Sequence, residues 1–124
     1  MSYRVNADIT PHLANEAGLA VRVQGLRRYY AALLTRRGLL RIVKVRDGVE
    51  TLLAETPFDW SFDTAYQFSI DVAGRHIRCS IGKTALNAQD DDRDFFYDGA
   101  LALVVSGGAL SSNEICVRPI RLSS

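Results

Sequence analysis

With 124 residues, the chain is long enough to bury the core of one domain without disulfides or metals. Its composition, 48% hydrophobic and 23% charged, is that of a folded globular protein and argues against a disordered chain. No apolar run approaches the ~20 residues of a membrane span, and the N-terminus lacks the apolar centre of a signal peptide. The two cysteines, Cys79 and Cys116, are too few for a disulfide framework. We therefore expect one domain over residues 1–124, cytoplasmic, with reduced cysteines and no membrane contact.

The net charge of +1 hides an asymmetry along the chain. Residues 1–46 carry nine basic and two acidic side chains, whereas residues 47–98 carry eleven acidic and four basic ones. Two interpretations stay open: the two sets pair across the folded molecule, or the basic strands share a face that attracts an anion such as a phosphate, a nucleotide or an acidic glycan. A pI near 7.8 argues against a nucleic-acid partner.

The first half of the chain predicts five strands. The first runs from Tyr3 to Thr10 and ends at Pro11, because proline lacks the N–H that a ladder needs. Residues 11–17 are expected to form a helical turn or a loop. The segment 28–34 could be helical, since Ala and Leu favour helix, but its two tyrosines and its short length favour a strand. The other expected strands are 19–24, 39–45 and 49–55, the last two joined by an Asp47-Gly48 hairpin turn.

The second half holds the clearest pattern, an antiparallel meander over residues 66–86. Its apolar residues alternate with polar ones on either side of two Gly-containing turns, and a third strand follows at 84–88. The connection 56–64 is expected to place Phe58 or Trp60 in the core. A polar loop at 87–98, an apolar strand at 99–105 and a last strand at 110–117 complete the chain. About ten short strands without a long helix predict an all-β, antiparallel sandwich or barrel.

Because the first strand begins almost at the first residue, we expect a module that is excised from, or accessory to, a larger protein.

Six segments, taken in their order along the chain, resemble a known family of modules. They are AGLAVR at 17–22, YYAALL at 29–34, LLRIVKVRDG at 39–48, LLAE at 52–55, YQFSIDVAGRHIRCSIGKTAL at 66–86 and GALALVV at 99–105. In this order and spacing they resemble the concanavalin A-like lectin/glucanase modules, the laminin G-like jelly rolls. The resemblance implies a two-sheet antiparallel jelly-roll β-sandwich in which a concave sheet or a rim often binds sugars.

A narrower resemblance concerns the stretch VRVQGLRRYYAALL, which looks like modules appended to ADP-ribosylglycohydrolase-type enzymes. It implies a non-catalytic accessory module whose partner domain, a hydrolase, carries the chemistry. Catalytic members of the wider family carry a pair of Glu residues on the concave face, and here Glu50 and Glu55 lie on opposite parities, so we do not expect an enzyme. His76 and Cys79 also fall on opposite faces, which argues against a nucleophilic dyad.

Five residues from three consecutive strands form the predicted ligand site. Arg22 and Gln24 share one parity, opposite the apolar Leu19, Val21 and Val23, and would meet the next strands if these pair in order. An aromatic ring beside guanidinium and amide groups suits a sugar or an ADP-ribose-like ligand. The alternative is that these are ordinary outward residues, because the solvent face of any sheet carries such polar and aromatic side chains. Tyr29 lies on the other parity and is expected in the core. The predicted ligand-binding residues are Arg22, Gln24, Tyr30, Arg41 and Lys44.

A possible Ca²⁺ site is predicted at Asp90, Asp92 and Asp94, which offer carboxylate oxygens at alternate positions of the polar loop. The loop lacks the glycine and the bidentate glutamate of an EF-hand, so a solvated loop that pairs with the basic strands is the alternative. No other cofactor is expected.

Two functions remain open at this point. The first is a non-catalytic accessory module that binds a carbohydrate or an ADP-ribose-like ligand on a basic, Tyr-containing sheet face. The second is a structural or interaction module that docks on a catalytic domain or self-associates as a homodimer through an exposed edge.

Overall fold

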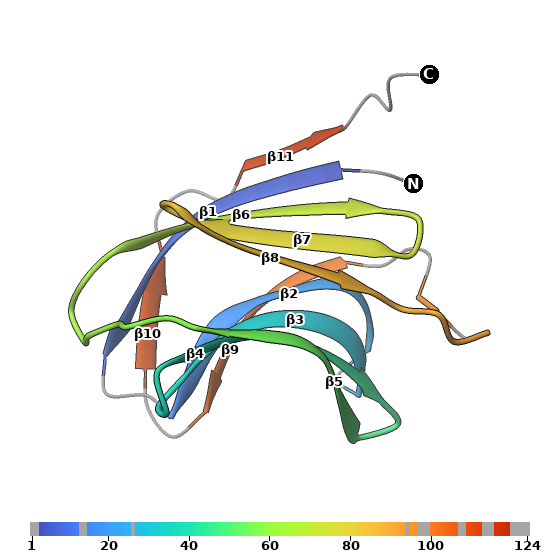
Figure 1. Ribbon diagram of the computed structural model, residues 1–124, viewed down its shortest axis with the longest axis horizontal. Helices are drawn as coiled ribbons and strands as arrows, with labels where there is room; N and C mark the ends of the chain where they lie inside the picture. Colours follow the sequence, from blue (N-terminus) through green and yellow to red (C-terminus); the bar gives the residue numbers. More distant parts are fainter. Residues whose placement is uncertain are drawn as a thin grey trace.

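Two antiparallel sheets pack face to face in the computed structural model, which describes residues 3–12, 15–25, 27–93 and 95–96, and the backbone of 100–106, 109–112 and 116–119 (Figure 1). One sheet, the meander sheet, has the order β10-β1-β6-β7-β8, with β11 also on β1; the other, the arched sheet, has the order β5-β4-β3-β2-β9. The strands are β1 Tyr3–His12, β2 Glu16–Gly25, β3 Arg28–Thr35, β4 Leu39–Arg46, β5 Val49–Pro57, β6 Tyr66–Ala73, β7 His76–Ile81, β8 Thr84–Gln89, β9 Ala100–Ser106, β10 Ala109–Ser112 and β11 Cys116–Pro119.

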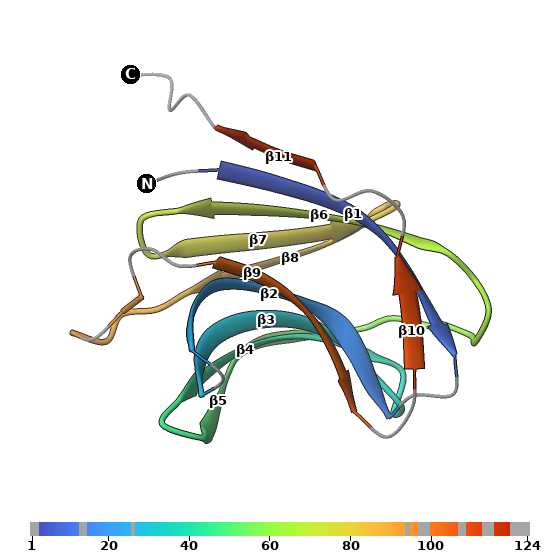
Figure 2. The ribbon, with the colours of Figure 1, turned by 180° about the vertical axis from the view of Figure 1, so that it is seen from behind.

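The all-β, two-sheet sandwich is confirmed, and so are the meander and the Asp47-Gly48 hairpin. Three details of the strand prediction are wrong. The helical turn or loop expected over residues 11–17 is shorter, because β1 extends to His12 and β2 begins at Glu16. Pro11 lies inside β1 and pairs with β10, because the pairing of β1 with β6 ends at Ile9, so that no ladder hydrogen bond to β6 needs the N–H that proline lacks. The single strand expected at 110–117 is two strands, β10 and β11, which pair with opposite ends of β1 (Figure 2).

Strand alternation builds the core between the sheets. In β1, β6, β7 and β8 of the meander sheet one parity of each strand is buried, and Cys79 belongs to it, as expected. Both aromatic residues expected in the connection, Phe58 and Trp60, are half-buried and pack against this core. The buried apolar residues of the core are Tyr3, Val5, Ala7, Ile9, Leu19, Val21, Tyr30, Ala32, Leu34, Leu40, Ile42, Phe68, Ile70, Val72, Ile77, Cys79, Ile81, Leu86, Ala88 and Phe96.

The arched sheet curves away from the meander sheet, so its outer face is concave (Figure 1). Small residues of β2 and β3 lie at the centre of this face. A Cβ added at Gly18 would lie 1.9 Å from the carbonyl oxygen of Ala32, so glycine allows the two strands to approach there. A second apolar cluster, Ala20, Ala31, Leu33 and Val43, forms the floor of the concave face, and each of these residues is at most 4% exposed. The described residues contain no helix that is long and apolar enough to cross a bilayer.

The buried thiol of Cys79 gives a first prediction. Burial raises the pKa of Cys79 to about 12, so its thiolate is scarce at neutral pH. In a Cys116→Ser variant, which leaves Cys79 as the only cysteine, we expect no labelling by a thiol-specific chromogenic disulfide at pH 8 until denaturant unfolds the chain. Labelling of the folded protein at the rate of a free thiol would contradict the burial of this strand.

Candidate functional site

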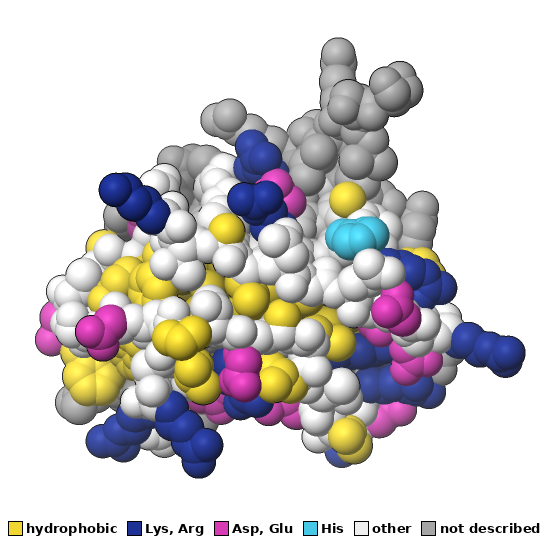
Figure 3. All heavy atoms as spheres, viewed as in Figure 1, with side chains coloured by type: hydrophobic (Ala, Val, Ile, Leu, Met, Phe, Trp, Pro, Cys, Tyr) yellow, Lys and Arg dark blue, Asp and Glu magenta, His cyan; other side chains and the backbone are white. Residues whose placement is uncertain are grey.

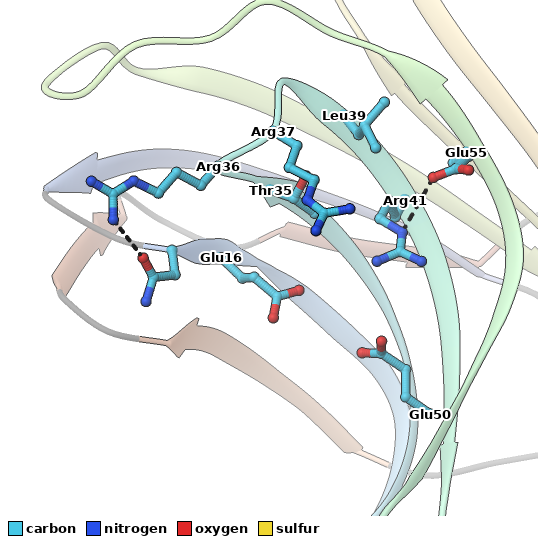
Figure 4. Close-up of a pocket in the computed structure, with 9 residues that line it drawn as sticks. Glu16, Thr35, Arg36, Arg37, Leu39, Arg41, Glu50 and Glu55 are labelled. Carbon is cyan, nitrogen blue, oxygen red and sulfur yellow. Dashed lines mark hydrogen bonds and ion pairs between the residues drawn. The ribbon is translucent and has the colours of Figure 1, made fainter.

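The concave face of the arched sheet holds a groove of about 400 Å³. Its walls come from the start of β2, the end of β3 with the turn that follows, and the strands β4 and β5 (Figure 4). The groove lies over the apolar floor, because the lining residues of β3 and β4 share the parity of Leu33 and Val43. The lining residues are Asn15, Glu16, Thr35, Arg36, Arg37, Leu39, Arg41, Glu50 and Glu55.

Acidic and basic side chains converge on the same space. Figure 4 shows Glu16, Glu50, Arg37 and Arg41 pointing into the hollow under the arch from three different strands and the β3–β4 turn. Arg41 also pairs with Glu55 at 3.4 Å. Within the described part of the chain, no ion pair is formed by Glu16, Glu50 or Arg37, so their charges are available to a ligand.

Two further groups belong to this face. The Oγ1 of Thr35, a residue that is 7% exposed, is buried in the groove wall and has no hydrogen-bond partner among the described residues. Tyr29 is half-buried against the apolar floor, and burial raises the pKa of its hydroxyl, with the negative charges of Glu50 and Glu16 adding to the effect. The phenol therefore stays protonated near two carboxylates and can donate a hydrogen bond.

The side chains of Glu50 and Glu55 lie on the same face, and the prediction that their parities separate them is wrong. The register between β4 and β5 shifts after Ile42, which pairs with Ala54, whereas Val43 pairs with Leu52. This bulge adds one residue to β5 and reverses the alternation, so both glutamates end in the groove. Alternation in the sequence cannot reveal a bulge.

Of the five predicted ligand-binding residues, Arg41 lies in the groove and Gln24 is exposed at the end of β2. The other three are interior: Arg22 is 0%, Tyr30 1% and Lys44 4% exposed. The expectation that these five share an outward face is therefore wrong.

Tyr29 and Tyr30 lie on the opposite faces of the sheet from those predicted. Tyr30 enters the core and Tyr29 lies on the concave face. The sequence offered no choice between them because β3 is apolar on both parities, so alternation identifies two faces without saying which one is inside. Apolar residues on both faces of this strand were the signal that the outer face also carries an apolar surface.

A backbone irregularity moves Arg22 inward. Its φ is 50°, and the pairing of β2 with β3 shifts register after Val21. The side chain turns to the open end of the sandwich, where the guanidinium donates hydrogen bonds to the carbonyl oxygens of Gly74 and Phe96.

Lys44 and Asp90 form a buried ion pair at the same end, with their charged atoms 2.7 Å apart. The Tyr30 hydroxyl donates to the Asp90 carboxylate at 2.5 Å and accepts from the backbone N–H of Phe96 at 2.9 Å. Burial raises the pKa of Asp90, but hydrogen bonds from Lys44, Tyr30 and the Asp92 backbone together outweigh it and lower the pKa below its ordinary value. This buried polar cluster, Arg22, Tyr30, Lys44 and Asp90, ties the loop after β8 to the arched sheet.

The predicted calcium ligands lie beside this cluster. Asp90 is held by Lys44, and Asp92 lies 3.7 Å from Lys44 and 3.6 Å from Arg46. Asp94 is outside the described residues. A cation bound here would have to displace an ammonium from Asp90. Among the residues that the structure describes, no three His, Cys, Asp or Glu side chains are grouped to hold a metal ion.

Solved structures share this fold. The carbohydrate binding module CBM66 from Bacillus subtilis superimposes with a TM-score of 0.84 at 16% identity, over 94% of this chain and 74% of that one. Chicken galectin 2 superimposes with a TM-score of 0.71 at 8% identity, over 94% and 89% of the two chains. The GH43 protein BlXynB from Bacillus licheniformis gives a TM-score of 0.69 at 13% identity over 96% of this chain, which spans only 28% of that protein. No protein family and no curated protein matches the sequence.

Removal of the buried carboxylate gives a second prediction. Asp90→Asn removes the nearer of the two carboxylates that face the buried Lys44 ammonium, and we expect a loss of about 3 kcal/mol in the free energy of unfolding. Asp91→Asn, at an exposed neighbour, is the matched control and should change stability by less than about 0.5 kcal/mol. Urea unfolding monitored by circular dichroism measures both.

The pH dependence of the same variant follows from the lowered pKa of Asp90. A carboxyl whose pKa is depressed on folding contributes stability above its unfolded pKa of about 4, and this contribution is lost as the pH falls through the folded value. The unmodified protein should therefore lose stability more steeply below about pH 4 than Asp90→Asn does. Parallel acid profiles would show that Asp90 is not ionised in the folded protein.

Proposed function

We propose that the concave face of the arched sheet binds a carbohydrate and that the chain performs no chemistry on it. The observation that carries this proposal is the convergence of two glutamates and two arginines, drawn from separate elements, over an apolar floor (Figure 4). The shared fold with a carbohydrate binding module and a galectin supports it.

The chemistry of the groove suits a polyhydroxylated ring. The carboxylates of Glu16 and Glu50 accept hydrogen bonds from sugar hydroxyls, and the guanidinium groups of Arg37 and Arg41 donate to hydroxyl or ring oxygens. The small residues of the floor leave room for the apolar C–H face of a sugar ring, beside the ring of Tyr29. Hydrogen bonds to charged groups contribute about 1.5 to 3 kcal/mol each, so loss of one is measurable.

The charge of the groove favours a neutral sugar over ADP-ribose. Arg36, Arg37 and Arg41 could meet a pyrophosphate, but Glu16, Glu50 and Glu55 line the same space and would repel it. An ADP-ribose-like ligand and a partner hydrolase domain remain proposals that rest on the resemblance of the sequence. The chain matches only 28% of the length of the GH43 protein, so the same fold forms one part of a larger protein there. This supports an accessory role beside a larger catalytic unit.

A docking role is the second candidate, and one observation favours it. The edge strand β5 exposes apolar side chains, with Val49 67% and Leu52 41% exposed. Figure 3, in the view of Figure 1, shows a band of apolar side chains across this side of the molecule, between the sheets. Self-association through this edge predicts a concentration-dependent increase in mass by analytical ultracentrifugation that Val49→Lys abolishes.

A further prediction tests the groove directly. Titration calorimetry against mono-, di- and trisaccharides of xylose, glucose, galactose, mannose and fructose, and against ADP-ribose, should identify at least one sugar that binds. For that sugar, Arg41→Ala and Glu50→Gln should each weaken binding at least about tenfold, because each removes a charged hydrogen-bonding group.

The matched control is Arg78→Ala. It removes an exposed arginine from β7, in the meander sheet, and should leave the affinity unchanged. A sugar that binds the unmodified protein and both groove variants equally well would place its site elsewhere, and binding of ADP-ribose alone would favour the nucleotide ligand.

A further inference from the structure

A second hollow of about 390 Å³ adjoins the groove at the β3–β4 turn. The two hollows share Arg36 and Arg37, which stand on this turn and form the boundary between them. The remaining lining residues of the second hollow come from the turn itself and from the connection between β5 and β6: Gly38, Asp59, Trp60, Ser61 and Phe62.

Aromatic rings form one wall of this hollow. Trp60 and Phe62 meet edge to face, with centroids 5.4 Å apart and ring planes at 80°. The indole N–H of Trp60 donates to the carbonyl oxygen of Thr35 at 2.6 Å. Because Thr35 lines the first groove, this hydrogen bond fixes the aromatic wall relative to it. Phe62 is 37% exposed, so part of its ring faces the solvent.

Polar groups face the same hollow. Asp59 is exposed and forms no ion pair within the described residues, so its carboxylate can accept hydrogen bonds. Arg36 is positioned by a 3.1 Å hydrogen bond to the side-chain oxygen of Asn15, and Arg37 faces both hollows. Ser61 donates its backbone N–H to the Tyr66 hydroxyl at 2.7 Å, which anchors the connection. The second hollow thus repeats the composition of the first: an apolar surface, carboxylate and guanidinium.

We infer that the second hollow is a subsite for a further sugar residue, so that the ligand is an oligosaccharide of at least two residues that crosses the β3–β4 turn at Arg37. This inference rests on the proposed function of the groove. Each hollow lies near the lower end of the ~300–1,000 Å³ range of small-ligand sites, which suits one ring in each hollow. The exposed face of Phe62 packs on the second ring, and Asp59 and Arg37 bind its hydroxyls.

The single tryptophan of the chain makes the inference testable. Because Trp60 lines only the second hollow, its fluorescence reports on that hollow. For the sugar found to bind, mono-, di- and trisaccharide are titrated into the full chain by calorimetry and by tryptophan fluorescence. We expect the disaccharide to bind about tenfold tighter than the monosaccharide and to change the Trp60 emission, while saturating monosaccharide leaves the emission unchanged.

A variant separates the two hollows. Phe62→Ala should weaken the disaccharide about tenfold and leave monosaccharide affinity unchanged, because the first ring does not touch Phe62. Val49→Ala, an exposed apolar residue outside both hollows, is the control and should change neither affinity. Thermal unfolding of both variants confirms that they fold.

Three outcomes overturn the inference. The first is equal affinity for mono- and disaccharide, the second is an unchanged Trp60 emission with bound disaccharide, and the third is full disaccharide affinity in Phe62→Ala. Each would confine the ligand to the first groove and leave the proposed function standing. Failure of every sugar to bind would instead overturn the proposed function itself.

Discussion

The structure depends on the arch of one sheet, because that sheet must cover the core with one face and form a groove with the other. Strand β3 is apolar on both faces, with Tyr30, Ala32 and Leu34 inside and Ala31 and Leu33 outside. Apolar residues are tolerated on this outer face because the curvature shields them, so that each is at most 4% exposed to solvent. Glycine and alanine at the centre of β2 and β3 allow the close approach that the bend requires. The groove is therefore a consequence of the same residues that specify the sheet.

A buried ion pair stabilises one end of this arrangement and explains the charge asymmetry of the chain. Every ion pair among the described residues joins a basic side chain of residues 1–46 to an acidic one of residues 47–98. Most of these charges thus form ion pairs across the fold. Lys44 and Asp90 are the extreme case, since both are nearly inaccessible and each would be costly to bury alone. Glu16, Glu50 and Arg37 are exceptions: they line the groove and form no ion pair with any residue that the structure describes.

The sequence predicts most of the fold and little of the site. Alternation locates the strands, since a period of two is a local property, and turn residues separate them. Which parity faces inward is a property of the whole sandwich, so Tyr29 and Tyr30 were assigned to the wrong faces. Bulges at Arg22 and near Leu53 reverse the alternation and carry no local signal. For this reason the alternation predicts the wrong face for Arg22 and opposite faces for Glu50 and Glu55. Of the predicted residues Arg41 lines the groove, whereas Arg37, on a turn between two hollows, could be recognised only from the tertiary structure.

We propose that the concave face of the arched sheet is the ligand-binding surface. It is tested most directly by two-dimensional ¹H–¹⁵N NMR of the labelled chain during titration with a sugar that binds. Chemical-shift changes are expected in β2, β3, β4, β5 and the β3–β4 turn, with β6, β7 and β8 unaffected. Changes that are confined to the meander sheet, or that centre on the loop after β8, would contradict it.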